Sequence, residues 1–173
     1  MAKDGVHFVI TGGTIDSVYD GSKDTVVPSK ESILPEVMSL VKTSMPFEFT
    51  EVCMKDSREL NGSDREEIYE TCKQSEYSRI VITHGTYTMG DTARFLMGKP
   101  GLEQKTIIVT GSLLPIKGFS PSDGTFNLGY AIAQTEYLKH GVYQALHAQV
   151  YAADVNIASM SKERHPNSVF SKN

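Results

Sequence analysis

The sequence has few of the residues and patterns that mark several large protein classes. Only two cysteines, Cys53 and Cys72, occur in 173 residues, with no C-x-x-C spacing and no histidine near them. We expect both to be reduced, buried thiols rather than disulfide or zinc ligands. No segment gathers the run of about five or more lysines and arginines that attracts phosphate backbones, and the net charge is −4. Nucleic acid is therefore not an expected partner.

Long apolar runs are also missing. The first residues lack the continuous apolar stretch of about 7–15 residues that marks a secretory signal, and no later run approaches the about 18 residues that cross a bilayer. We therefore expect a cytoplasmic protein with no membrane partner. The patterns G-x-x-x-x-G-K-[ST], G-x-G-x-x-G and G-x-S-x-G do not occur. Nucleotide-binding and α/β-hydrolase functions thus have no fingerprint here.

The composition that remains is that of a globular protein, with 39% hydrophobic and 22% charged residues. A chain of this size can bury roughly 70% of its unfolded surface. We expect a single α/β domain over residues 1–173, no second domain, and a polar, mobile tail over residues 159–173.

Short, β-branched apolar runs predict strands at 8–11, 47–52, 80–83 and 106–110, with a fifth across 145–151. Three of the first four are almost continuously apolar, which is typical of strands buried on both faces of a parallel sheet. Helical spacing predicts helices between them, from Ser32 to Val41, from a capping box at Ser63, from Met89 to Met97, and over about 122–140. The fourth helix is expected to bury Phe126, Tyr130, Ala133 and Tyr137. This order of elements predicts an α/β fold of three layers with a doubly wound, mainly parallel sheet, flavodoxin-like in type.

Ligands of such sheets bind outside the carboxyl ends of the strands. The segments expected there are rich in glycine and hydroxyl groups: 11–17, 55–57, 83–88 and 110–112. Any tight turn favours such residues, so one segment alone means little. Four at one edge favour a small-molecule site over turn chemistry.

Hydroxyl groups without a cysteine at this edge indicate an oxygen nucleophile. A threonine hydroxyl needs a nearby base and backbone amides aimed at the developing oxyanion. Gly13 beside Thr14 and Gly85 beside Thr86 are expected to leave N–H groups free for that task, although both threonines could equally be helix caps. The five histidines show no metal-ligand spacing, and His84 is expected to be a structural hydrogen-bonding residue rather than a general base.

Several motifs then occur in a specific order: Thr11-Gly12-Gly13-Thr14-Ile15, Asp56-Ser57, His84-Gly85-Thr86-Tyr87-Thr88-Met89, Thr110-Gly111-Ser112, and Ser122-Asp123-Gly124 with Asn127. In this order they resemble the amino-terminal domain of the bacterial-type L-asparaginase family, over residues 7 to 135. That family hydrolyses the side-chain amide of asparagine, and sometimes glutamine, with a threonine nucleophile and without metal or cofactor.

The resemblance implies a role for each matching residue. Thr14 would be the nucleophile, Asp56 and Ser57 would hold the substrate's α-carboxylate and α-amino end, and Thr86 would work with a lysine in proton transfer. Lys162 lies at a suitable distance beyond the fifth strand, although the alignment is loose there. Gly13, Gly85 and Tyr87 complete the expected substrate-binding set.

The sequence departs from the family in three ways. The family motif reads His-Gly-Thr-Asp-Thr, whereas Tyr87 stands at the aspartate position, and losing one partner of a buried charge pair costs about 2–5 kcal/mol. The loop after the first strand carries Val26 where the family has an assisting tyrosine, and Tyr19 in the same loop could substitute. The chain is also too short to contain the family's second domain.

Asp16 and Asp91 are carboxylates near the expected site, and either could replace the missing aspartate. The alternative is that both only complement helix dipoles. Three functions therefore stay open: a small amidohydrolase that acts as a homo-oligomer, a dimer or tetramer; an impaired relative that binds an amino acid as a regulator; and a subunit whose partner supplies the second domain. A transfer-RNA-dependent amidotransferase role is disfavoured because no basic surface is evident.

Overall fold

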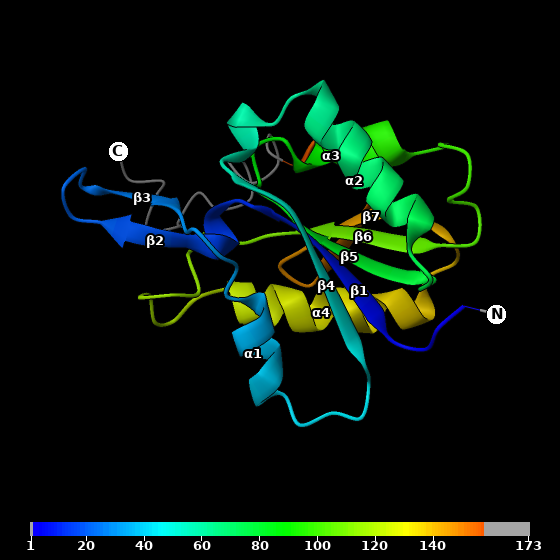
Figure 1. The fold of residues 1–173 in the computed structure, drawn as a ribbon, viewed down its shortest axis with the longest axis horizontal. Helices are drawn as coiled ribbons and strands as arrows, with labels where there is room; N and C mark the ends of the chain where they lie inside the picture. The colour runs from blue at the N-terminus through cyan, green and yellow to red at the C-terminus, as the bar shows by residue number, and fades with distance from the viewer. Residues whose placement is uncertain (1, 158–173) are drawn as a thin grey trace.

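A computed structural model describes residues 2–157, and these form a mixed six-stranded sheet with helices on both faces (Figure 1). The strand order is β4-β1-β5-β6-β7-β8. The strands are β1 (Val6–Gly12), β4 (Phe47–Lys55), β5 (Arg79–Thr83), β6 (Thr106–Thr110), β7 (Gly141–Leu146) and β8 (Gln149–Ala152). All neighbours pair in parallel except β7 and β8. The predicted doubly wound α/β fold is confirmed.

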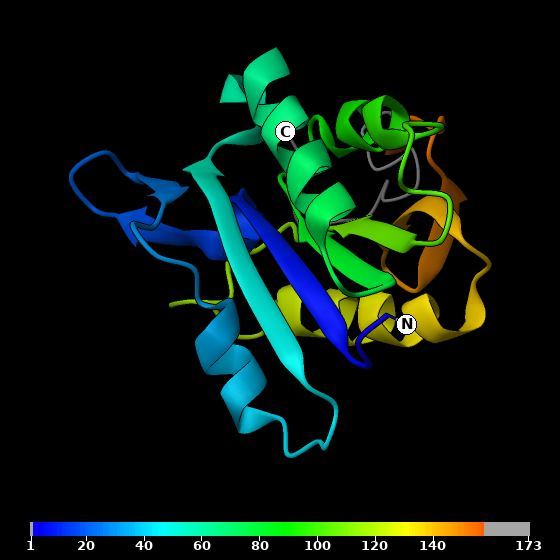
Figure 2. The ribbon, with the colours of Figure 1, turned by 45° about the vertical axis from the view of Figure 1, so that its right-hand side comes forward.

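The helices form the two outer layers, as Figures 1 and 2 show from two directions. Helices α2 (Gly62–Gln74) and α3 (Met89–Leu96) cover one face, and α1 (Leu34–Leu40) and α4 (Gly124–Tyr137) cover the other. Strand side chains alternate between the layers, so Val9 and Ile82 pack with α2 and α3, whereas Phe8 and Ile10 pack with α1 and α4. None of the helices in the described part of the chain is long and apolar enough to cross a bilayer.

The crossover connection from β6 through α4 to β7 is left-handed, which is unusual. The chain moves in the same direction across the sheet from β5 to β6 and from β6 to β7, yet α3 and α4 lie on opposite faces. The connections through α1, α2 and α3 are mutually consistent with the usual right-handed crossover, so the β6–α4–β7 connection is left-handed. Its loop, residues 111–123, must therefore cross the carboxyl edge of the sheet, and the N–H of Ile116 donates to the carbonyl of Ile15 there.

The prediction of one strand across 145–151 is wrong. Two antiparallel strands, β7 and β8, meet at a tight turn in which His147 and Ala148 have φ values of 50° and 60°. His147 and Ala148 do not signal such a turn, because glycine or asparagine usually occupies its positions. A second hairpin, β2 (Ser17–Asp20) with β3 (Thr25–Pro28), was also not expected, and it extends away from the sheet in Figure 1.

The orientation predicted for α4 is wrong as well. Phe126, Ala133 and Tyr137 are exposed, and only Tyr130 of the four is half-buried against the core. The side of the helix with Leu128 and Ala131 packs on the sheet. A buried polar side chain explains this choice. Asn127 donates to the carbonyl of Gly111 and accepts from the N–H of His147, and both bonds require that its side of the helix faces inward.

Smaller corrections concern helix ends. Helix α2 is capped by Asn61 rather than Ser63, because Asn61 and Asp64 form the reciprocal pair of hydrogen bonds two residues earlier. Val41 and Met97 were expected to face inward but are exposed. Each is the C-cap residue of its helix and has an extended backbone, so it no longer follows the helical spacing.

Candidate active site

The chain reverses its direction across the sheet between β1 and β5, and the loops that follow these two strands touch. A Cβ atom on Gly13 would lie 2.3 Å from the backbone nitrogen of Gly85, and a Cβ on Gly85 would lie 2.6 Å from Oγ of Ser57. Gly13 also has φ 79°, where a side chain is strained. Glycine is therefore required at both positions for the three loops after β1, β4 and β5 to meet. Open α/β sheets bind their ligands at this kind of switch point.

Thr14 begins the short 3₁₀ helix η1 (Thr14–Asp16) directly after Gly13. Its side chain is partly exposed, and no hydrogen bond joins its hydroxyl to another residue of the described chain. The turn behind it is fixed, because Asp16 N–H and the Ser17 hydroxyl both donate to the carbonyl of Gly13. Thr14 thus presents, from a firmly held backbone, a hydroxyl that no other described residue binds.

One expectation about this turn is wrong. The N–H of Gly13 is not free for an oxyanion, because it donates to the carbonyl of Lys55 at 2.9 Å. The pairing of β1 with β4 continues past the end of β1 and uses this donor.

Ser57 is the first residue of the 3₁₀ helix η2 (Ser57–Glu59) and is almost completely buried, with 1% of its surface exposed. Its Oγ finds no hydrogen-bond partner among residues 2–157. A buried hydroxyl without a partner is costly, and a bound polar group would remove the cost. Thr88 holds the residue in place by donating to its carbonyl at 2.7 Å.

Asp56, Arg58 and Tyr87 form one cluster beside Ser57. The Arg58 guanidinium makes two hydrogen bonds to the Asp56 carboxylate, at 3.0 and 2.7 Å, and these hold the pKa of Asp56 below its ordinary value. The same guanidinium lies 5.1 Å from the centre of the Tyr87 ring, within range of a cation–π contact. Tyr87 itself is 61% exposed. Arg58 was not predicted as part of the site, since nothing in an Asp-Ser-Arg segment shows that the arginine turns back onto the aspartate.

His84 is structural, as expected. Burial lowers its pKa to about 4, so the ring is neutral at physiological pH. Its Nδ1 lies 2.8 Å from the carbonyl of Gly85, which can only accept, so the proton is on Nδ1 and Nε2 accepts from the Thr92 hydroxyl at 2.8 Å. The ring thereby ties the Gly85 loop to helix α3.

Thr86 is half-buried beside the loop that follows β6: a Cβ on Gly111 would lie 3.6 Å from the methyl carbon of Thr86. Its proposed partner Lys162 lies outside the described residues. The chain that leads toward it is well fixed, since the buried Gln144 donates to the carbonyls of Ala152 and Val155.

The carboxylates suggested as replacements have other contacts. Asp16 is buried and accepts from the hydroxyl of Ser32 and the N–H of Ile33, both at 2.8 Å. Burial raises its pKa to about 6, against the lowering effect of these two hydrogen bonds. Asp91 is exposed and pairs with Arg94 at 3.2 Å. The idea that either replaces the family aspartate stays a prediction.

Tyr19 and Val26 face each other across the β2–β3 hairpin, where they are direct partners in the register. Residues paired in this way project from the same face of a hairpin. Tyr19 therefore occupies the same face as the position where the family tyrosine is expected, and its hydroxyl donates to Asp24.

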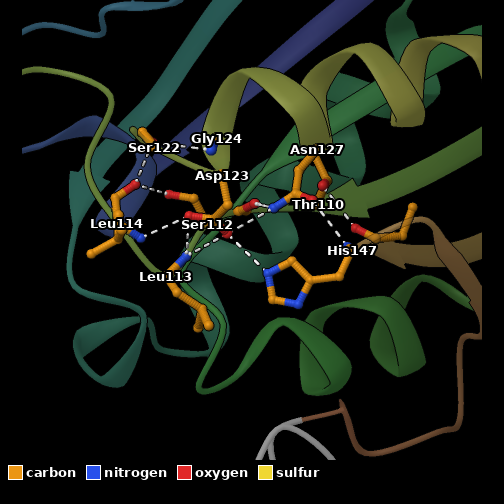
Figure 3. A network of polar contacts seen from close by, with 11 residues as sticks. Thr110, Ser112, Leu113, Leu114, Ser122, Asp123, Gly124, Asn127 and His147 are labelled. Carbon is orange, nitrogen blue, oxygen red and sulfur yellow. Dashed lines mark hydrogen bonds and ion pairs between the residues drawn. The ribbon is translucent and has the colours of Figure 1, made fainter. Parts of the chain in front are cut away.

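The loop over residues 111–123 is held by Asp123, as Figure 3 shows. Its carboxylate accepts from the N–H groups of Leu113 and Leu114, from the Asn127 amide and from His147 Nε2 at 3.0 Å. Burial acts to raise the pKa of Asp123, but the hydrogen bonds outweigh it and hold the pKa below its ordinary value. The left-handed connection is thus anchored at both the start of α4 and the β7–β8 turn.

No group of three or more His, Cys, Asp or Glu side chains within residues 2–157 is arranged to hold a metal ion. The chemistry at the switch point is that of hydroxyl groups, backbone amides and one ion pair.

Comparison with known proteins decides the family. The model of the asparaginase amino-terminal domain matches residues 5–165. This chain belongs to the asparaginase family. The resemblance inferred from the motifs is confirmed.

Relatives within the asparaginase family share about three in ten residues. The glutaminase-asparaginase of Acinetobacter glutaminasificans is 28% identical over 164 residues, which are 87% of this chain and 48% of that protein. L-asparaginase 1 of Escherichia coli K12 is 30% identical over 143 residues, 74% of this chain and 39% of the relative. L-asparaginase I of Vibrio cholerae superposes with a TM-score of 0.72 at 27% identity, covering 88% of this chain and 47% of that one. The chain thus spans about half the length of these asparaginases, or less.

Proposed function

We propose that this asparaginase-family chain is an amidohydrolase that converts the side-chain amide of L-asparagine, or a related amide, to the acid and ammonia through Thr14. The observation that carries the proposal is that the hydroxyls of Thr14 and of the buried Ser57 come together at the Gly13–Gly85 contact, and that neither has a hydrogen-bond partner within residues 2–157. One can react while the other binds the far end of a small polar substrate.

The proposed reaction has two steps. Thr14 Oγ attacks the amide carbon, its proton passes to the leaving nitrogen, and the C–N bond breaks to release ammonia and leave an ester on Thr14. Water then adds to the ester carbon, the C–O bond to Thr14 breaks, and the hydroxyl is restored. Thr86 and Lys162 are proposed to move the protons, for which the lysine pKa must lie well below about 10.4.

Substrate binding is assigned to the second and third loops. The Ser57 hydroxyl is proposed to donate to the substrate α-carboxylate, and a bound carboxylate would satisfy this buried donor. Asp56 is proposed to accept from the α-amino group. Because Arg58 already neutralises Asp56, we expect weak binding of that amino group. Tyr19, in the β2–β3 hairpin, is proposed to assist Thr14. It would replace the tyrosine that the family carries at the position of Val26, the residue opposite Tyr19.

The test is ammonia release by the full chain with L-asparagine, L-glutamine and D-asparagine. Thr14→Ala is expected to reduce the rate by about 1,000-fold or more, as loss of a nucleophile does. Thr25→Ala is the matched control, because Thr25 is an exposed threonine of the β2–β3 hairpin that pairs with Asp20 rather than with Tyr19. An equal rate for Thr14→Ala and the unmodified chain would overturn the assignment. If neither the unmodified chain nor either variant released ammonia, catalysis would be contradicted and the ligand-binding or subunit roles would be favoured.

Two further expectations stay proposals. A cytoplasmic location agrees with a structural neighbour, a probable cytoplasmic L-asparaginase from Campylobacter jejuni, with a TM-score of 0.69 at 24% identity. Assembly into a homo-oligomer, a dimer or tetramer, is likewise a proposal.

A further inference from the structure

The carboxylates that flank Ser57 in the chain both have cations beside them. Arg58 donates to both oxygens of Asp56: its backbone N–H and Nε donate to one oxygen at 2.9 and 3.0 Å, and Nη2 donates to the other at 2.7 Å. Glu59, the last residue of η2, has two cations near it, Arg58 and Lys55. The loop after β4 therefore offers no carboxylate that lacks a cation.

The neighbouring loop after β5 adds no negative charge. Residues 84–88 contain no Asp, Glu, Lys or Arg, and burial lowers the pKa of His84 to about 4, so its ring is neutral near pH 7. What this loop supplies beside Asp56 is the ring of Tyr87, whose centre lies 5.1 Å from the Arg58 guanidinium. A ligand at Ser57 thus meets a guanidinium, a neutral ring and a carboxylate that is already paired.

These groups treat the two charges of an amino-acid substrate differently. Its carboxylate finds the hydroxyl of Ser57, which is buried and has no partner within residues 2–157, and the positive charge of the next residue attracts the same group. Its ammonium finds no unpaired carboxylate in the loops after β4 and β5 and lies near a like charge, which weakens binding. A substrate with the carboxylate but without the ammonium brings only the charge for which these loops have partners.

We propose that the site selects monoamides of dicarboxylic acids that have no α-amino group, with succinamic acid as the four-carbon member, and that Arg58 sets this preference through its pair with Asp56. This inference rests on the proposed function and narrows its substrate. The reaction stays the same: the ester on Thr14 forms and is hydrolysed, the C–N bond breaks, and succinamate and water give succinate and ammonium. For a substrate with an amino group, Asp56 stays a weak acceptor.

The first test compares kcat/KM of the full chain for ammonia release from succinamic acid and from L-asparagine. The unmodified chain is expected to favour succinamic acid by about 10-fold or more, because only L-asparagine brings an ammonium group beside Arg58. A kcat/KM for L-asparagine that equals or exceeds the value for succinamic acid would overturn the inference and leave the proposed function standing.

Substitutions of Arg58 test its role. Arg58→Gln frees Asp56 to accept from an ammonium group, so the ratio of the two kcat/KM values is expected to shift toward L-asparagine by about 10-fold or more. Arg58→Lys keeps the positive charge and is expected to keep the preference for succinamic acid. Lys73→Gln is the matched control, because it removes a cation from an exposed pair with Glu70 in the last turn of α2. The same ratio in Arg58→Gln and Lys73→Gln would overturn the inference.

Binding separates this inference from catalysis. Isothermal titration calorimetry with Thr14→Ala measures the affinity for intact succinamic acid and L-asparagine, because this variant cannot form the ester. Succinamic acid is expected to bind about 10-fold or more tightly than L-asparagine. That result, in a chain that releases no ammonia, would contradict the proposed function alone. Tighter binding of L-asparagine, or no binding of either compound, would overturn the inference.

Discussion

At the scale of single residues, sequence motifs can identify the hydroxyl groups of the site but cannot identify its cation, Arg58. Thr14 and Ser57 were predicted from the hydroxyl-rich loops and from the family resemblance, and both lie at the contact between Gly13 and Gly85. The ion pair of Arg58 with Asp56 was not predicted, because it depends on how one side chain folds back over a turn.

Replacing Tyr87 tests which end of the substrate the cluster of Asp56, Arg58 and Tyr87 binds. Tyr87→Asp is expected to raise kcat/KM for L-asparagine by about 30-fold or more, because a carboxylate there pairs with the substrate ammonium group. Tyr87→Phe, which keeps the ring over Arg58 but adds no charge, is expected to give no gain.

Steady-state kinetics with succinamic acid, which has the same amide but no amino group, provides the control substrate. The gain from Tyr87→Asp should be absent with it. A similar gain with both substrates would contradict a role in ammonium binding.

Asp16 predicts a specific pH dependence of stability. Its folded-state pKa of about 6 lies above the ordinary 3.8, so the folded protein keeps a proton that the unfolded chain loses first. The stability from this group is therefore complete below about pH 4 and is lost as the pH rises through about 6, by about 3 kcal/mol in total.

Urea unfolding of the unmodified protein and of Asp16→Asn at about pH 4 and pH 7 measures this effect. The free energy of unfolding should fall between these two pH values by about 2 kcal/mol more in the unmodified protein than in the variant. Parallel pH profiles would show that Asp16 does not titrate in this range.

At the scale of elements, polar anchors decide how helices and loops sit around the site. His84 ties the Gly85 loop to α3, Asn127 sets the orientation of α4, and Asp123 holds the loop over residues 111–123. Apolar periodicity located the four α-helices of residues 2–157, but it placed the wrong side of α4 inward because that helix is apolar on both sides. A pattern of apolar residues cannot choose between two such sides, whereas one buried amide can.

The His84 anchor can be tested with a substitution of nearly equal volume. Thr92→Val leaves Nε2 of the buried ring without a donor and is expected to lower the free energy of unfolding by about 1–3 kcal/mol. Thr135→Val is the matched control, since Thr135 is a buried threonine in α4 whose hydroxyl donates only to the carbonyl of Ile132 in its own helix.

The control is expected to lose less than about 1 kcal/mol, because it leaves no buried group unpaired. If chemical denaturation gave equal losses in the free energy of unfolding for both variants, the His84–Thr92 hydrogen bond would contribute no more to stability than the Thr135 bond.

At the scale of the whole molecule, the sheet order and the left-handed connection bring the site together. The alternation of strands and helices predicted a doubly wound sheet, and the switch point between β1 and β5 follows from its order. The face that α4 covers could not be predicted, since right-handed connections are the general rule and nothing local in residues 111–123 signals an exception. The proposed site depends on this connection, because its loop crosses the carboxyl edge of the sheet and bonds to Ile15 beside Thr14.

The central claim is that Thr14 is the nucleophile of this asparaginase-family chain. The most direct measurement is mass spectrometry of the protein quenched in acid during turnover of L-asparagine, followed by mapping of the modified peptide. We predict an aspartyl ester on the peptide that contains Thr14, and none in Thr14→Ala. Ammonia release with no ester on Thr14, or an ester on Thr86 instead, would contradict the account.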